Sequence, residues 1–374
     1  MLANAKRIVI KIGSSLIINE HNLVRESWLA SLAADILALK HQCKQVIIVT
    51  SGAVALGREV LGYGYGTHKY ELELEEKQAA AACGQIRLFS HWKEALRFGT
   101  ETLYPAQILL TADDSINRRR YLNARNTLNT LLENEHIVPV INENDTVATE
   151  ELRFGDNDRL AARVAQMAGA DLLILFSDID GLYAADPRIN PQAEFKTEIA
   201  DITPQIEAMA GGAGSAIGSG GMATKIAAAK IALSAGCHMI IARGTGEHPL
   251  RTLQDGGRHT RFIAKESPLS ARKHWIAGSI HPAGSVTVDD GAAKALKSGK
   301  SLLPAGVTAI EGNFDRGDAV LIRDGGGKVL GKGLISYAST DAARIKGRKS
   351  QEIEQILGFK RRDVLIHRDD MVLE

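Results

Sequence analysis

Short apolar runs alternate with longer stretches of helical spacing up to about residue 264. Runs rich in β-branched residues predict buried strands at Arg7–Ile12, Val46–Thr50, Ile137–Ile141, Leu172–Phe176 and Met239–Ala242. The stretches between them predict helices at Arg25–Lys40, Lys77–Phe98, Ser115–Glu135, Asp158–Ala168 and Ala223–Ala235. Because the strand runs are apolar throughout, they favour a parallel sheet that is covered on both faces. The alternation of strands and helices predicts an α/β fold.

The pattern changes after about residue 264, where short strand-like pieces are separated by Gly and Asp. These pieces are Val286–Asp289, Val307–Ile310, Ala319–Arg323, Val329–Ser336 and Val364–Leu373. They predict a small β-rich module. The stretch Lys265–Pro282 contains two prolines and little periodicity, which is typical of a junction. We therefore expect one domain over residues 1–264, a linker over 265–281 and a second domain over 282–374.

Composition and charge narrow the class of protein. The 374 residues are 45% hydrophobic and 24% charged, which is enough apolar material for a sizeable core. Lys plus Arg number 45 and Asp plus Glu 44, so net charge draws the chain neither to nucleic acid nor to an anionic membrane, and any bound anion requires a local site. Three scattered cysteines without a CxxC pair, and an N-terminal apolar run interrupted by Lys11, predict a cytoplasmic protein.

Two lysine- and glycine-containing segments are candidates for binding phosphate. Lys11, Gly13 and Ser14 follow the first predicted strand, where backbone N–H groups and a lysine can meet an anion. The loop Gly218–Lys225 runs into a predicted helix and offers the same chemistry without the spacing of a P-loop. An ordinary turn at Lys11–Ser15 explains the first segment equally well. The glycine content of the second exceeds what a connector needs.

Polar clusters end three other predicted strands. Thr50–Ala53 and Ile141–Asp145 each follow a strand, and Phe154–Asp158 opens a helix, so their hydroxyl, amide and acid groups can bind an ammonium or carboxylate group. Asp156 alone is equally explained as a helix N-cap. Ser177 and Asp178 close a fourth strand, where a loop can form part of a nucleotide pocket. The 11 histidines lack paired spacing, and no metal site is predicted.

Taken in order, KIGSSL, VTSGAVALG, INENDTVA, FGDNDRLAA, FSDIDGLYAADPR and GSGGMATKIAAA resemble the amino acid kinase family, and within it the members whose phosphoryl acceptor is glutamate. The motifs PAGSVTVDDGA, SLLPAGV, NFDRGD and SQEIEQILG resemble a PUA domain. The resemblance implies a three-layer sandwich with a mostly parallel central sheet, followed by a small β-rich PUA domain. It also implies ATP-dependent phosphorylation of the side-chain carboxylate of L-glutamate, the first step of proline biosynthesis.

The resemblance further assigns roles to residues of this chain. Lys11 and Lys225 would stabilise the transition state, with Asp158 orienting them. Substrate would be bound by Ser51, Gly52, Ala53, Asp145, Asp156 and Asn157. Nucleotide would be bound by Lys11, Gly13, Ser14, Ser177, Asp178, Ser219, Gly220, Gly221, Met222, Ala223, Thr224 and Lys225. Mg²⁺ would be held mainly through ATP phosphates, as that ion prefers. The segment Gly62–Glu76 is longer and more charged than the family pattern.

Partners also follow from the resemblance. It implies proline as a feedback inhibitor, a homo-oligomer (dimer or tetramer) and association with a glutamyl phosphate reductase, with no membrane partner. Two alternatives stay open. One is RNA binding or RNA modification through the PUA domain, although residues 282–374 carry only 15 Lys and Arg against 13 Asp and Glu. The other is a kinase acting on aspartate or N-acetylglutamate.

Overall fold

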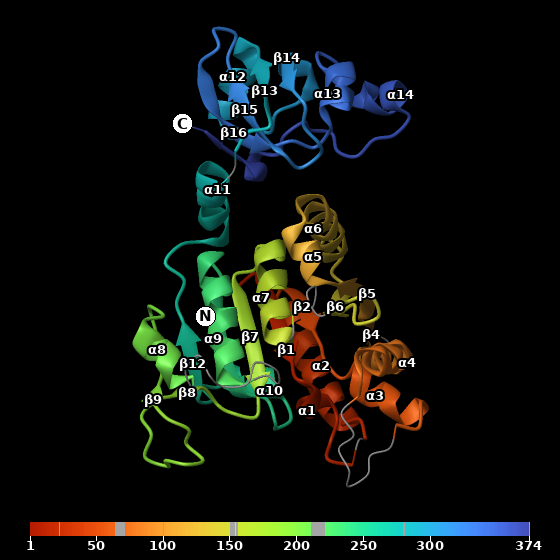
Figure 1. Ribbon diagram of the computed structural model, residues 1–374, viewed down its shortest axis with the longest axis vertical. Coiled ribbons are helices and arrows are strands. Elements are labelled where there is room, and N and C mark those ends of the chain that lie inside the picture. The colour runs from red at the N-terminus through yellow and green to blue at the C-terminus, as the bar shows by residue number, and fades with distance from the viewer. Residues whose placement is uncertain are drawn as a thin grey trace. The chain divides into compact units, whose positions relative to one another are not determined.

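The computed structural model describes every residue except 22, 64–71, 100, 150–153, 155, 211–220, 280 and 374. The chain divides into two compact units, Met1–Pro268 and Leu269–Glu374. Figure 1 shows both units along the chain, with the N-terminal unit in red to green and the C-terminal unit in teal to blue. Within the described ranges, no helix combines the length and the apolar composition needed to cross a membrane.

The first unit is built on an eight-stranded sheet in the order β10-β12-β11-β7-β1-β2-β6-β5. Its strands are β1 (Arg7–Ile12), β2 (Gln45–Val49), β5 (Tyr104–Leu110), β6 (Ile137–Glu143), β7 (Leu172–Ser177), β10 (Glu198–Ile199), β11 (His238–Arg243) and β12 (His259–Phe262). All paired strands are parallel except β11 with β12. The predicted α/β class with a mostly parallel central sheet is therefore confirmed.

Both faces of the sheet are buried. Along β1, Ile8, Ile10 and Ile12 belong to one apolar core, whereas Val9 belongs to the core on the other face. Successive side chains of a strand point to opposite faces, so burial of both faces removes the alternation expected of a half-exposed strand. Figure 1 shows helices on either side of the sheet, which gives the three layers that the family resemblance implies.

The helices of the first unit fall into two layers and several short connections. The longer ones are α2 (Glu26–His41), α4 (Leu74–Ala95), α6 (Arg118–Leu132), α7 (Asn157–Ala168) and α9 (Met222–Ser234). The shorter ones are α1 (Ser14–Ile17), α3 (Ala53–Val60), α5 (Ala112–Ile116), α8 (Pro204–Met209) and α10 (Pro249–Gln254). Short hairpins pair β3 (Arg97–Phe98) with β4 (Glu101–Thr102) and β8 (Leu182–Tyr183) with β9 (Phe195–Lys196).

Local capping explains where the predicted helix boundaries differ from the structure. The helix expected at Ser115–Glu135 divides into α5 and α6 at Asn117, whose side chain accepts a hydrogen bond from Arg120 N. Helix α4 begins at Leu74, because Glu73 and Glu76 form a reciprocal capping box. The sheet also contains β5, β10 and β12, which the sequence analysis did not predict. Strand β5 lies at the edge with Tyr104 exposed, so its sequence lacks the apolar run of a central strand.

Helices α3 and α4 cross at a contact between two glycines. A Cβ atom at Gly57 would lie 1.7 Å from Ala80 O, and one at Gly84 would lie 1.8 Å from Ala53 O. No larger residue fits at these distances without displacing backbone. The crossing fixes the start of α3, which follows β2 directly, against the middle of α4. It thereby holds the segment Ser51–Ala53 in place.

The second unit contains a five-stranded sheet in the order β14-β13-β15-β16-β17. Its strands are β13 (Gly284–Val288), β14 (Val307–Gly312), β15 (Ala319–Arg323), β16 (Val329–Leu334) and β17 (Met371–Leu373). Its helices are α11 (Pro268–Ser279), which begins at the last residue of the first unit, α12 (Asp290–Lys297), α13 (Ser339–Ile345) and α14 (Ile353–Leu357). Helix α11 occupies most of the segment 265–281, for which the sequence indicated little regular structure. The β-rich character expected of this region is confirmed.

Candidate active site

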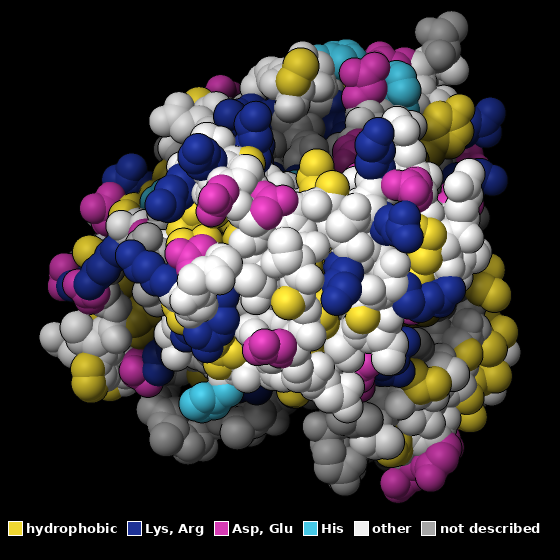
Figure 2. Space-filling model, turned by 90° about the horizontal axis from the view of Figure 1, so that it is seen from above, with side chains coloured by type: hydrophobic (Ala, Val, Ile, Leu, Met, Phe, Trp, Pro, Cys, Tyr) yellow, Lys and Arg dark blue, Asp and Glu magenta, His cyan; other side chains and the backbone are white. Residues whose placement is uncertain are grey.

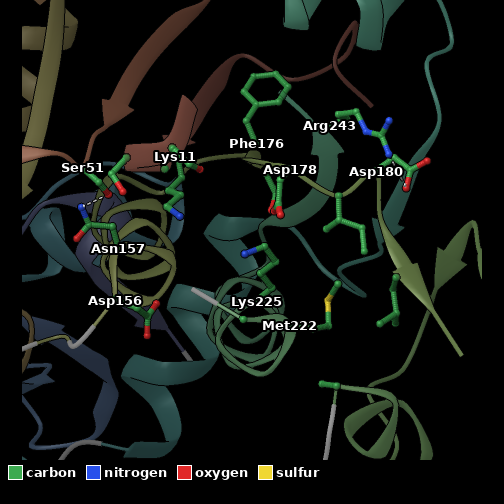
Figure 3. A pocket seen from close by; sticks show the side chains of 18 of the residues that line it. Lys11, Ser51, Asp156, Asn157, Phe176, Asp178, Asp180, Met222, Lys225 and Arg243 are labelled. Atoms are coloured by element: carbon green, nitrogen blue, oxygen red, sulfur yellow. Dashed lines mark hydrogen bonds and ion pairs between the residues drawn. The ribbon is translucent and has the colours of Figure 1, made fainter. Parts of the chain in front are cut away.

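A cavity of about 1810 Å³ lies where the central parallel strands end. Its walls come from the segments after β1, β2, β6 and β7 and from the starts of α3, α7 and α9. The carboxyl ends of parallel strands meet at one edge of the sheet, which is where ligands bind in open α/β folds. Figure 3 shows that side chains from several of these elements point into the same space.

Two buried lysines share one buried aspartate at this edge. Lys11 Nζ, at the end of β1, lies 2.6 Å from Asp158 Oδ1, and Lys225 Nζ, in α9, lies 3.1 Å from Asp158 Oδ2. Thr224 Oγ donates to the same Oδ2 at 2.9 Å. Asp158 is fully buried, whereas both lysines line the cavity. The carboxylate therefore holds two cationic side chains from different elements at one place, as Figure 3 illustrates for Lys11 and Lys225.

The charge state of Asp158 follows from these contacts. Burial alone would raise the pKa of this carboxyl, but the adjacent ammonium groups of Lys11 and Lys225 outweigh it and hold the pKa below its usual value. Asp158 is therefore an anion between two cations at neutral pH. The cluster carries one net positive charge, which suits an anionic ligand.

Helix α7 presents two neighbouring polar side chains to another part of the cavity. Asp156 is its N-cap and accepts a hydrogen bond from Arg159 N at 2.8 Å. Burial raises the pKa of Asp156, with the nearby Asp158 carboxylate adding to the effect. Asn157 donates through Nδ2 to Thr50 O at 2.6 Å and to Ser51 Oγ at 2.7 Å. This part of the cavity therefore offers amide, hydroxyl and carboxylate groups.

The opposite part of the cavity lies beyond β7. Ser177 Oγ donates to Asp178 Oδ1 at 2.9 Å, and both residues line the cavity. Tyr183 OH donates to Asp180 Oδ1 at 2.9 Å, and the guanidinium of Arg243 lies 4.0 Å from the same atom. Apolar side chains join these polar groups, among them Met209 and Met222. The mixture of polar groups and methionines provides both hydrogen bonds and an apolar surface.

Most of the predicted site residues line this one cavity. They are Lys11, Gly13, Ser14, Ser51, Gly52, Ala53, Asp145, Asp156, Asn157, Ser177, Asp178, Gly221, Met222 and Lys225. Asp158 and Thr224 lie behind the lysines, and Ala223 follows in the first turn of α9. Ser219 and Gly220 lie outside the described residues, as does segment 64–71 of the charged stretch Gly62–Glu76. The assignment of roles to these residues stays a prediction.

The sequence analysis missed several residues that line the cavity. Arg58 and Val54 face it from α3, and Ala208 and Met209 from the end of α8. Nothing in their local sequence distinguishes these residues from ordinary helix surface. Arg243 was recoverable, because it is the last residue of β11 and the rule that ligands gather at strand ends applies to it as to Ser177.

A model of the amino acid kinase family matches residues 6–243, and a model of the PUA domain matches residues 284–357. The first match covers seven of the eight strands of the central sheet, all except β12, and the lysine–aspartate–lysine cluster. The chain belongs to the amino acid kinase family.

Its similarity to individual members extends over the full length. It is 60% identical over 374 residues to the glutamate 5-kinase of Paramagnetospirillum magneticum, a match covering 100% of this chain and 99% of that protein. It is 55% identical over 372 residues to the glutamate 5-kinase of Sinorhizobium fredii, covering 100% and 93% of the two chains. Carbamate kinase from Giardia lamblia shares the fold, with a TM-score of 0.50 and 16% identity over 71% of this chain and 100% of its own.

Proposed function

We propose that this protein transfers the γ-phosphoryl group of ATP to the side-chain carboxylate of L-glutamate, giving L-glutamyl 5-phosphate and ADP. The observation that carries the proposal is the pair of cavity-lining lysines held by buried Asp158. Full-length relatives that are named glutamate 5-kinase support the choice of acceptor. The reaction is the first step of proline biosynthesis.

The chemistry requires positive charge more than a base. The acceptor carboxylate is already ionised at neutral pH, so no proton has to be removed before its oxygen attacks the γ-phosphorus and the bond to the β-phosphate oxygen breaks. The barrier arises from bringing two anions together and from charge on the phosphoryl oxygens. Lys11 and Lys225 would stabilise that charge, and Asp158 would fix their positions.

We assign the two substrates to two parts of the cavity. Ser51, Asp145 and Asn157 would bind L-glutamate, with Gly52 and Ala53 contributing backbone and Asp156 nearby. Ser177 and Asp178, together with the segment 219–225, would bind ATP, joined by Gly13 and Ser14 after β1. Gly52 has φ +110°, a conformation that glycine adopts without strain, so it can turn its N–H toward a ligand between β2 and α3.

Mg²⁺ would reach the site mainly on the ATP phosphates. The carboxylates nearest the lysines are already engaged, since Asp158 pairs with two lysines, Asp156 caps α7 and Asp178 accepts from Ser177. In the described part of the chain, His, Cys, Asp and Glu side chains form no group of three that could hold a metal. This donor set fits an ion carried by phosphates, which would neutralise part of their charge.

Further properties are proposed on the family resemblance alone. They are a cytoplasmic location, feedback inhibition by proline, assembly into a dimer or tetramer, and contact with a glutamyl phosphate reductase. RNA binding by the second unit is not proposed. Several of its basic groups are already paired internally, including Arg362 with Asp370 at 3.3 Å and Lys360 with Asp363 at 2.6 Å. On the face drawn in Figure 2, Lys and Arg side chains are interspersed with Asp and Glu.

The test is ATP-dependent trapping of the acyl phosphate as a hydroxamate. L-Glutamate, L-aspartate and N-acetyl-L-glutamate are compared with the intact chain and with Lys225→Ala. Lys230→Ala is the matched control, because Lys230 lies on the same helix but is half-exposed and pairs with Glu207. Hydroxamate formation from L-glutamate alone, lost only in Lys225→Ala, is the expected result. A folded protein that forms hydroxamate from aspartate or N-acetylglutamate instead would overturn the choice of acceptor.

A further inference from the structure

A chain of three side-chain amides connects helix α4 to the part of the cavity assigned to L-glutamate. Asn157 Nδ2 donates to Asn142 Oδ1 at 3.0 Å, and Asn142 Nδ2 donates to Gln85 Oε1 at 2.8 Å. Asn142 and Asn157 line the cavity, whereas Gln85 of α4 is not among the residues of its wall. Among the described residues, the hydrogen bond to Asn142 joins the Gln85 side chain to the site.

The direction of every amide in this chain is fixed by one backbone carbonyl. Thr50 O can only accept, so the atom of Asn157 that faces it at 2.6 Å must be the donor Nδ2. Asn142 must then present its oxygen to Asn157 and its nitrogen to Gln85. Gln85 in turn must present its oxygen, Oε1, to Asn142.

This arrangement leaves Asn157 Oδ1 for the ligand. The hydrogen-bond contacts of the Asn157 amide in the described structure are all made by Nδ2, whose two hydrogens are shared among Thr50 O, Ser51 Oγ and Asn142 Oδ1. Figure 3 shows the amide nitrogen of Asn157 directed toward Ser51. An ammonium group can only donate hydrogen bonds. The oxygen of Asn157 is thus suited to the α-ammonium of an amino acid.

We propose that Gln85 is a positioning residue for amino-acid binding, which holds the Asn142 amide so that Asn157 offers its oxygen to the α-ammonium of L-glutamate. The inference rests on the proposed function. Asn142 is 4% exposed, so water does not readily replace a lost partner. Without an acceptor at position 85, no hydrogen bond holds Asn142 Nδ2 away from Asn157. A reversed Asn142 amide would then place its own Nδ2 against Asn157 Nδ2, so that two donors face each other.

The fold explains how a residue of α4 reaches this point. Gly84 makes the close contact with Ala53 at the crossing of α3 and α4, and Gln85 is the next residue. On the same helix, Gln78 Nε2 donates to Ala148 O at 3.1 Å, in the segment that follows β6 and Asp145. Helix α4 thus contacts the loops on both sides of the proposed glutamate site.

The test compares Gln85→Met, which keeps the length but removes the acceptor, with Gln85→Glu, which keeps an acceptor for Asn142 Nδ2. KM for L-glutamate, KM for ATP and kcat are measured on the full chain by the hydroxamate assay, and folding by thermal unfolding. We expect Gln85→Met to raise KM for L-glutamate by about fivefold to thirtyfold, because the variant loses one buried hydrogen bond. KM for ATP should stay within about twofold of the native value. Gln85→Glu is expected to stay within about threefold of the native KM for L-glutamate.

Each other result has a defined meaning. An unchanged KM for L-glutamate in folded Gln85→Met, or equal rises in KM for both substrates, would overturn the inference. If Gln85→Met does not fold, a Gln85→Glu variant that folds with a strongly raised KM for L-glutamate overturns it as well, because the acceptor is retained. If the native protein forms no hydroxamate from L-glutamate, the proposed function is overturned. This result differs from a failure of the Gln85 inference, in which the native protein is active.

Discussion

Lys11 Nζ and Asp158 Oδ1 lie 2.6 Å apart, although their residues are 147 positions apart in the chain, and neither side chain is more than 9% exposed. The contact joins the end of β1 to the first turn of α7. Lys225, from α9, completes the cluster on the second oxygen of the same carboxylate. Three elements of the first unit are therefore tied together by charges at the point where we propose that phosphoryl transfer occurs.

Removing either lysine is expected to reduce turnover more than substrate binding. Lys11→Ala and Lys225→Ala should each lower kcat by about a hundredfold or more, because they remove charge that opposes the negative phosphoryl oxygens. KM for L-glutamate should change by less than about fivefold. Steady-state kinetics with Lys230→Ala as the control measures this. A large rise in KM with unchanged kcat would assign the lysines to binding instead.

Asp158→Asn should destabilise the fold as well as reduce kcat. The substitution leaves two buried ammonium groups without their counter-ion, which costs about 3 kcal/mol or more in the free energy of unfolding at pH 7. Denaturant unfolding of the native protein and the variant gives that difference directly.

The pH dependence of this difference has a defined sign. The pKa of Asp158 in the folded protein lies below its ordinary value of 3.8. Its stabilising effect is therefore fully present above pH 3.8 and is lost as the pH falls through the lower folded pKa. The native protein and Asp158→Asn should accordingly converge in stability only in strong acid. Convergence between pH 5 and pH 7 would contradict this account.

The contribution of Asp156 to stability is expected to have the opposite pH dependence. Burial raises the pKa of this N-cap carboxyl in the folded state, so the native protein loses stability as the pH rises from about 3.8 through that raised value. Asp156→Asn keeps the cap acceptor and removes the titration, so it should be at least as stable as the native protein at pH 7. Asp156→Ala loses the cap, at a cost of about 1 kcal/mol. Denaturant unfolding at pH 3 and pH 7 distinguishes the three proteins.

Gly84→Ala should disrupt the crossing of α3 and α4. Its Cβ would lie 1.8 Å from Ala53 O, so the helices must separate, at a cost of about 3 kcal/mol in the free energy of unfolding. Gly246→Ala is the control in the same unit, because a Cβ there meets no atom within 4 Å. Its expected change is within about 0.5 kcal/mol. Equal stability of the two variants would show that the crossing tolerates a side chain.

The apolar pattern predicted the central strands well because they are buried on both faces, so each is a continuous β-branched run. The predicted run Arg7–Ile12 coincides with β1, and the other four central strands differ by one or two residues at their ends. Strands β5 and β10, at the two edges of the sheet, and β12, which is antiparallel to β11, were missed. Edge and antiparallel strands are partly exposed and carry no such run.

The sequence by itself also determined which residue types stand at the ends of the strands, and most of the site residues predicted from them line the cavity. It could not determine that Asp158 bonds both lysines, or that Gln85 reaches Asn142 from behind the cavity wall. Those contacts join elements far apart in the chain, and side-chain hydrogen bonds depend on distances of a few tenths of an ångström. Only the packing of α4, α7 and α9 against the sheet sets such distances.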